Sequence, residues 1–157
     1  MWKQTIAVQQ HFNDISWRIR GLALTALTAT LGLAAVAARD KSAIELFTWN
    51  IQLSSSILLL GLILWLSFYF VDQVWYHRLL IGAVKHGEAL ETALREHLPE
   101  AGLTHSVSLN SPYPVTFGVG RLRTPAMEIH SSAKMRIFYF VGGATLLSLS
   151  IVLQIGA

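Results

Sequence analysis

The sequence contains no cysteine, and only 13% of its 157 residues are charged. The absence of cysteine excludes disulfide bonds, thiolate catalysis and the zinc or iron–sulfur sites that need cysteine ligands. A typical soluble domain has about 25% charged residues, whereas 53% of this chain is hydrophobic. These proportions exclude a disordered chain and argue against an ordinary soluble globule.

Catalytic and metal-binding motifs are missing as well. The six histidines form no His-Glu-x-x-His arrangement and no pair with four-residue ligand spacing. No Gly-x-Ser-x-Gly motif surrounds the serines at 54–56 or 131–132. We therefore expect no catalytic residue, no metal site and no cofactor. The apolar runs also lack acidic residues, which argues against an ion-coupled carrier.

Three long runs without charge are the main positive feature of the sequence. They cover residues 21–38, 53–71 and 137–155. A helix needs about 20 apolar residues to cross a bilayer, with about 17–25 tolerated. A globule of this size cannot bury three helices that are apolar all round, so the sequence predicts an all-α membrane protein with three transmembrane helices.

The basic residues predict how the spans are oriented. Ten of the 12 Lys and Arg residues lie in segments 1–20 and 72–136, and only Arg39 and Lys41 lie in the short loop 39–52. Cytoplasmic loops carry the excess of Lys and Arg. We therefore expect the N-terminus and residues 72–136 in the cytoplasm, and the loop 39–52 and the C-terminus outside.

The cytoplasmic segments are expected to be partly helical. Residues 1–20 predict a helix that lies on the membrane face or docks under the bundle. Residues 72–98 predict a long helical extension of the second span, since no proline interrupts it before Pro99. Residues 99–136 are rich in Pro, Gly, Ser and Thr, which predicts an irregular loop with a short hairpin through 115–122.

Small and hydroxyl residues recur on one face of the first span. Thr25, Thr28 and Gly32 share that face with Gly21 and Ala35. Such a stripe suits either close helix packing or the lining of a pore. One copy of three helices has too few polar groups for a pore, so a pore would need a symmetric homo-oligomer of four or more copies.

A second set of candidates is basic. Arg78, Lys85, His86, Arg121 and Arg123 would bind an anionic ligand if they converged, with Tyr113 and Phe117 as stacking faces. The other interpretations stay open: a solvated face of an amphipathic helix for the first three, and contact with lipid headgroups for the two arginines of the loop.

The layout resembles the small membrane effectors of bacterial anti-phage systems, including those of cyclic-nucleotide systems and the channel subunit of Hailong-type systems. The resemblance covers the order of spans and basic insert, and the segment Asp72-Gln73-Val74-Trp75-Tyr76-His77-Arg78-Leu79-Leu80. It carries over no individual residue. The chain departs from these systems in having no recognisable nucleotide-sensing domain.

The resemblance implies an oligomeric pore in the bacterial inner membrane that depolarises the cell. Its gate would respond to a cytoplasmic nucleotide or short oligonucleotide, made by a nucleotide-synthesising partner protein. The alternative is a non-conducting membrane anchor or scaffold subunit that docks a soluble partner. A lipid-binding or lipid-modifying protein ranks last because no catalytic group is present.

Overall fold

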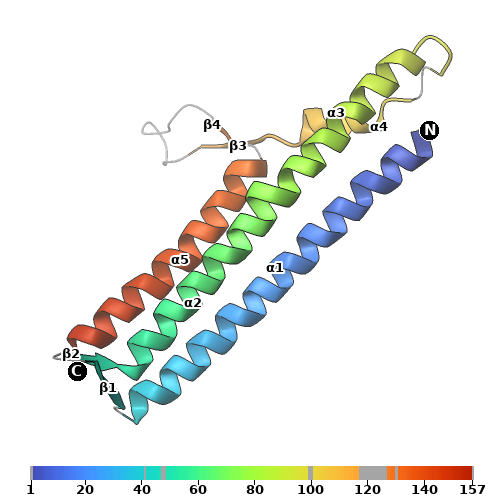
Figure 1. Cartoon of the computed structure of the whole chain (residues 1–157). Coiled ribbons are helices and arrows are strands. Elements are labelled where there is room, and N and C mark those ends of the chain that lie inside the picture. Colours follow the sequence, from blue (N-terminus) through green and yellow to red (C-terminus); the bar gives the residue numbers. More distant parts are fainter. Residues whose placement is uncertain are drawn as a thin grey trace.

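The computed structural model describes residues 2–40, 42–46, 49–98, 101–116, 127–129 and 131–156. Three long helices lie side by side along most of its length (Figure 1). The first is α1 (Trp2–Arg39), the second runs continuously through α2 (Leu53–Tyr69), η1 (Phe70–Tyr76) and α3 (His77–Leu94), and the third is α5 (Ser131–Ile155). Each is long and apolar enough to cross a membrane, which confirms the prediction of an all-α chain with three such helices.

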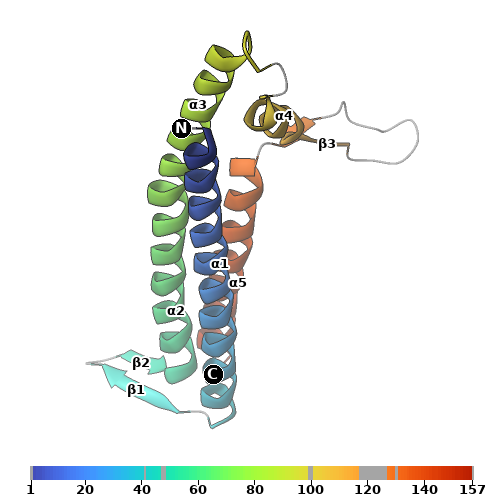
Figure 2. The ribbon, with the colours of Figure 1, turned by 90° about the vertical axis from the view of Figure 1, so that its right-hand side faces the viewer.

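The remaining elements are short. The hairpin of β1 (Ala43–Leu46) and β2 (Trp49–Gln52) joins α1 to α2, and α4 (Leu103–Asn110) follows α3. A second antiparallel pair, β3 (Tyr113–Val115) and β4 (Met127–Ile129), precedes α5. Figures 1 and 2 place the N-terminus, α3 and α4 at one end, and the C-terminus with the β1–β2 hairpin at the other.

Several predicted boundaries differ from the structure. No break separates residues 1–20 from the first span, because α1 is one helix of 38 residues. The extension of the second span is present but its helix ends at Leu94 rather than Leu98. The segment after it contains α4, which was not predicted, and β3 pairs with Met127–Ile129 rather than within 115–122.

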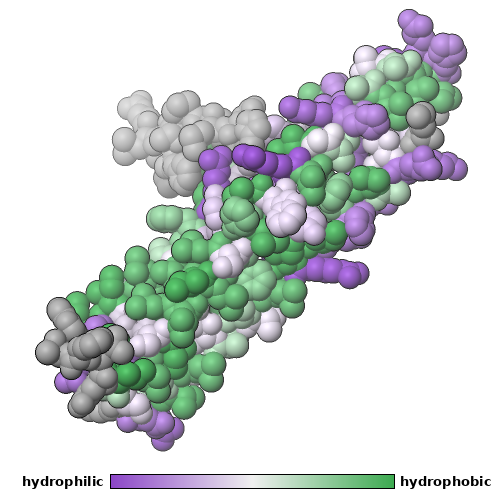
Figure 3. Space-filling model, viewed as in Figure 1, coloured by the Kyte–Doolittle hydropathy of each residue, from purple (hydrophilic) through white to green (hydrophobic). Residues whose placement is uncertain are grey.

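Apolar side chains cover most of the outer surface of the three-helix bundle. Only 17% to 28% of the residues in each apolar segment are buried within the chain. Figure 3 shows hydrophobic residues along the bundle and hydrophilic residues gathered toward the end that carries α3. A bilayer accounts for this surface, because lipid is the solvent in which outward-facing leucine, isoleucine and phenylalanine are stable.

The three helices pack through small residues and a few aromatic rings. A Cβ at Gly61 on α2 would clash with the Thr30 side chain of α1, and one at Gly142 on α5 would clash with the Trp65 ring. These close approaches are typical of helix packing in membranes, where van der Waals contact replaces the hydrophobic driving force. Trp65 is 2% exposed and donates from Nε1 to the Tyr139 carbonyl oxygen at 2.7 Å.

Polar contacts join α2 and α5 at the hairpin end of the bundle. The hydroxyls of Ser55 and Ser150 are 2.8 Å apart and both are buried. Farther along α5, the Gln154 carboxamide accepts from the Gln52 amide at 3.1 Å and donates to the Asn50 carbonyl at 3.0 Å. Ser150 and Gln154 of the third span therefore serve packing within one chain.

Candidate functional site

The predicted pore face of α1 lies outside the packing of its own chain. Thr25 and Thr28 are exposed, and their hydroxyls bond only to the helix carbonyls four residues earlier, at 3.0 and 2.9 Å. Both threonines line an open groove with Leu24 and Ala29. A Cβ at Gly32 would meet no atom within 4 Å, so this face is free to contact lipid or another copy.

The face of α1 that packs is two residues away from the predicted stripe, on nearly the opposite side of the helix. Ala23, Ala34 and Ala37 are buried, and Thr30 contacts Gly61. Two residues turn an α-helix by about 200° around its axis. The sequence shows two parallel stripes of small residues with the same spacing, and periodicity alone could not tell which one faces α2.

A buried charge cluster joins all three helices where the apolar runs end. Asp72, on η1, is 0% exposed. Its carboxylate accepts from Arg20 Nε at 2.8 Å and Nη2 at 3.2 Å, both from α1, and from the Tyr139 hydroxyl of α5 at 3.1 Å. Gln73 Nε2 donates a further bond at 3.1 Å. Four donors compensate this carboxylate for the loss of water.

Sequence reasoning missed this cluster because it treated Arg20 and Asp72 as the ends of two separate spans. A signal was present: opposite charges bound the first two apolar runs at the end predicted to be cytoplasmic. Antiparallel neighbouring helices bring such residues to the same depth. A search for charge pairs at matching ends of spans would have found the pair, though not its third partner, Tyr139.

Beyond this cluster, the first part of α1 together with α3 and α4 forms a polar unit that we call the head. Glu91 of α3 is 2% exposed and stands at the N-terminus of α4. Its carboxylate accepts from the backbone amides of Thr104 at 2.8 Å and His105 at 3.1 Å, and from the Trp2 indole at 3.4 Å. Gly102, the residue just before α4, has no side chain that could cap the helix. Glu91, which is distant in sequence, provides the N-terminal cap instead.

These bonds change the acidity of Glu91. Burial alone would raise its pKa, but the donors from Thr104, His105 and Trp2 outweigh burial and hold the pKa below its usual value. Because the pKa is lower in the folded chain than in the unfolded one, this contribution to stability is present at neutral pH. It is lost as the pH falls through the folded-state pKa.

The head contains a cavity of about 600 Å³ between α1, α3 and α4. Its floor is apolar, with Leu80, Ile81, Val84 and Val107, and its polar groups include one cation, Lys85, and one anion, Glu88. The other lining residues are Gln9, Gln10, Asn13, His77, Ser108 and Ser111. The volume falls within the range of small-molecule sites.

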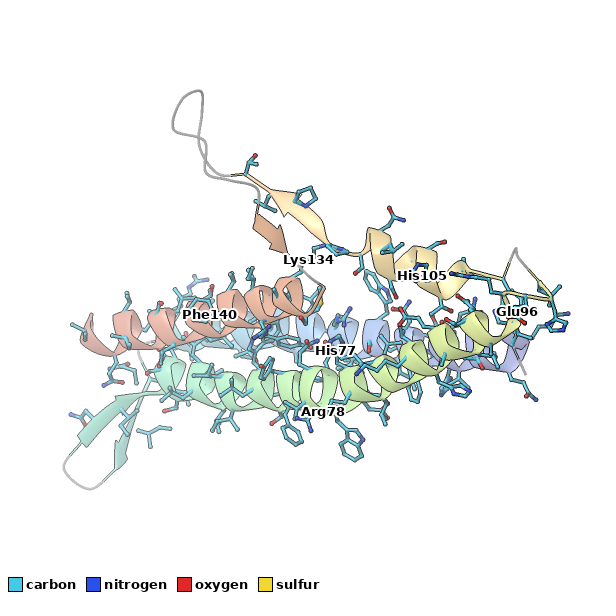
Figure 4. All side chains as sticks on the ribbon, turned by 90° about the horizontal axis from the view of Figure 1, so that it is seen from above. His77, Arg78, Glu96, His105, Lys134 and Phe140 are labelled. Atoms are coloured by element: carbon cyan, nitrogen blue, oxygen red, sulfur yellow. The ribbon has the colours of Figure 1, made fainter. Side chains whose placement is uncertain are left out.

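The structure does not bring the predicted ligand-binding residues together. Lys85 lines this cavity, whereas His86 lines a separate groove between α1 and α3 with Gln4, Thr5, Val8 and Ala83. Arg78 is exposed on α3, and Figure 4 shows it on the other side of that helix from His77. Arg121 and Arg123, like the proposed stacking residue Phe117, lie outside the described residues.

Among the described residues, no three His, Asp or Glu side chains are grouped so that they could hold a metal ion. The chain matches no protein-family model, and comparisons with curated proteins and with solved structures found no match. The resemblance to anti-phage effectors therefore rests on the layout of the sequence alone.

Proposed function

We propose that this chain is the subunit of a membrane-embedded homo-oligomer that conducts ions. The observation that carries the proposal is the exposed α1 face of Thr25, Thr28 and Gly32. The outward faces of α2 and α5 carry mainly large apolar side chains, with Leu60, Ile63, Phe140 and Val152 more than 60% exposed. The exposed hydroxyls among the described side chains of these two helices are those of Ser67, Thr145 and Ser148. A ring of four or more copies with the α1 face inward would place hydroxyl groups around a central path.

Conduction requires the oligomer because the centre of a single bundle is filled. Leu58, Trp65, Tyr139 and Leu146 are at most 4% exposed and pack in one cluster with Ala23 and Ala34. A path for ions through this cluster would need to remove rings that are locked by packing. The space between copies is therefore where the proposed pore runs.

The proposal extends to orientation and to the membrane concerned. The described structure supports an odd number of spans, because the head and the C-terminus lie at opposite ends of the bundle (Figure 1). With the excess of Lys and Arg on the side of the head, we place the head in the cytoplasm and the C-terminus outside. As an anti-phage effector, the oligomer would sit in the bacterial inner membrane and depolarise it.

Gating by a cytoplasmic ligand is the finer part of the proposal. The cavity of the head supports it as a place for a small molecule. A nucleotide or oligonucleotide also needs several cations around its phosphates, and the described lining of one copy supplies only Lys85. The remaining positive charge would come from neighbouring copies or from Arg121 and Arg123.

The test is ion flux through liposomes that contain the purified oligomer. Replacing both Thr25 and Thr28 with Leu makes the proposed lining apolar and closes it to water, so we expect most of the conductance to disappear. Thr145→Leu is the matched control, because Thr145 is an exposed α5 hydroxyl with the same bond to a carbonyl four residues earlier. The control should conduct normally.

Either of two results would contradict the pore. One is a mass in mild detergent of a single 17.4 kDa chain with no ion leakage. The other is equal conductance in the double variant and in Thr145→Leu.

The alternative, a non-conducting anchor or scaffold, is favoured by the surface of α4. Its side chains Leu103 and Val107, four residues apart on one face of the helix, are 51% and 63% exposed, and an apolar helix face on a polar unit is suited to docking a soluble protein. This function predicts stable co-purification with that partner and no effect of the chain on membrane potential.

A further inference from the structure

The second long helix changes its hydrogen-bonding pattern midway. η1, from Phe70 to Tyr76, is a π-helix between two α-helical stretches. A π-helix bonds residue i to i+5 and so holds an extra residue in its turn. Since each α-helical residue turns the chain by about 100°, η1 shifts the faces of α3 by about one residue relative to α2.

This shift determines which residues of α3 meet the rest of the head. Gln9 Nε2 of α1 donates to the Ala83 carbonyl at 3.1 Å, and Glu91 caps α4. Gly87 is packed so closely that a Cβ there would clash with the Gln9 side chain. The positions that face α1 and α4 are therefore Ala83, Gly87 and Glu91.

In an uninterrupted α-helix the preceding residues, Gly82, His86 and Leu90, would take these places. Leu90 cannot accept the amide bonds of α4, and the larger His86 side chain would lie against Gln9 and Thr104, where a Cβ would already be 3.1 Å from the Thr104 hydroxyl oxygen. The π-helical form therefore places on the head-facing side of α3 the residues that make these contacts. The local preference of the chain opposes the π form, since π-helices are rare and occur mostly as isolated turns.

The two ends of η1 are held very differently. Asp72, its third residue, is fixed to α1 and α5 through Arg20 and Tyr139. Near its other end Trp75 is 59% exposed, and the Tyr76 ring contacts α1 through the Phe12 ring, with the two centroids 6.5 Å apart. The part of η1 after Asp72 can therefore rearrange while the charge cluster holds the spans in place.

We propose that η1 is a register switch: docking of α4 on Glu91 holds η1 in the π form, and release of α4 lets it become α-helix and turns α3 by about one residue. The α3 residues that line the cavity between α1, α3 and α4 start at His77, the first residue after η1. A ligand in this cavity would therefore contact α3 next to the segment that changes its helical form. Only the use of this switch as a channel gate rests on the proposed function.

The first test changes the length of η1 by one residue in each direction. Deleting Val74 removes the extra residue, so the segment becomes α-helical and Ala83, Gly87 and Glu91 keep their faces. Inserting one alanine after Val74 is the matched control, because conversion to α-helix cannot absorb a residue that is added. A single deletion within a long helix would otherwise turn everything after it by about 100°.

Two readouts follow the head without relying on conductance. The first is disulfide formation between Val8→Cys and Ala83→Cys, which line one groove, in a chain that otherwise has no cysteine. It is measured by intact mass after the free thiols are alkylated. The second is hydrogen exchange at the Thr104 and His105 amides that Glu91 accepts.

The deletion should retain both the disulfide and the amide protection, and the insertion should lose both. Exchange at the two amides should become at least about tenfold faster in the insertion variant, as expected for losing hydrogen bonds to a charged group. If the deletion variant loses its head contacts as fully as the insertion variant, or does not fold, the switch is refuted.

The second test releases α4 in the chain of natural length. Glu91→Gln should reduce the yield of the disulfide between Val8→Cys and Ala83→Cys. It should increase the yield between Val8→Cys and Gly82→Cys, because Gly82 takes the place of Ala83 when α3 rotates. Glu88→Gln, one turn earlier on α3, should change neither. In the Val74 deletion, Glu91→Gln should leave the Ala83 disulfide intact, since no α-helical register remains to be gained.

Glu91→Gln could lose amide protection while the disulfide still forms at Ala83→Cys and not at Gly82→Cys. This result would show that α4 leaves while α3 stays in place. That result would overturn the coupling between α4 and η1. A chain that passes both tests but leaks no ions would keep the switch and refute only the proposed channel.

Discussion

Replacing Asp72 with asparagine is expected to weaken the bundle more than any other single polar substitution among the described residues. The change removes the charge from a fully buried side chain and leaves the Arg20 guanidinium, 20% exposed, without its partner. Breaking one half of a buried ion pair costs about 3–5 kcal/mol. The change in unfolding free energy should be visible by denaturant titration in mild detergent.

The control for this substitution is Asp14→Asn, which alters an exposed carboxylate on α1 and should change stability by less than about 0.5 kcal/mol. Adding Arg20→Met to Asp72→Asn should restore part of the loss, because it removes the uncompensated charge. If Asp72→Asn is no more harmful than Asp14→Asn, the cluster does not hold the helices together.

The second large effect is expected from a single methyl group at Gly142. Alanine normally stabilises a helix relative to glycine by about 1 kcal/mol. At Gly142, however, the new Cβ would clash with the six-membered part of the Trp65 indole. That ring is 2% exposed and fixed by its bond to the Tyr139 carbonyl, so it cannot move aside.

Gly142→Ala should therefore reduce the free energy of unfolding by about 1–3 kcal/mol, the usual cost of overpacking. Gly82→Ala is the matched control, because a Cβ at Gly82 meets no atom within 4 Å, and it should be neutral or stabilising. Thermal unfolding of both variants in the same detergent gives the comparison. Equal stabilisation by the two substitutions would show that α2 and α5 are not packed as described.

The membrane spans could be predicted because amino-acid composition alone identifies them. Runs of about 20 apolar residues give the helices at residues 21–38, 53–71 and 137–155 without any knowledge of contacts. The helix at residues 72–94 was also predictable, since no proline or other helix breaker interrupts it. The sequence at 1–20 predicted a helix, but its charges were interpreted as a boundary where the chain continues as α1.

The contacts between helices could not be predicted in the same way. The two stripes of small residues on α1 differ by two positions, and only the partner surface on α2 selects between them. The π-helix at η1 shifts α3 by about one residue, which no periodicity analysis of α3 alone detects. The cap on α4 joins Glu91 to residues 13 and 14 positions later, and α4 itself was hidden in a segment whose glycine and proline content predicts a loop.

The candidate ligand residues show the same limit. Arg78, Lys85 and His86 are close in sequence, but successive positions on a helix point in different directions. Lys85 reaches the cavity of the head and His86 reaches another groove. Proximity in sequence therefore identified the basic part of α3, whereas the chemistry of the cavity depends on side chains that α1 and α4 bring to it.

The most direct test of this account is the side of the membrane on which each end of the bundle lies. The chain has no cysteine, so single cysteines at the exposed positions Asn50, Asn110 and Gly156 can be labelled with a membrane-impermeant maleimide. We predict that Asn110→Cys is labelled only from the cytoplasmic side, and Asn50→Cys and Gly156→Cys only from outside. Labelling of Asn110→Cys and Gly156→Cys from the same side would contradict three membrane crossings and, with them, the proposed pore.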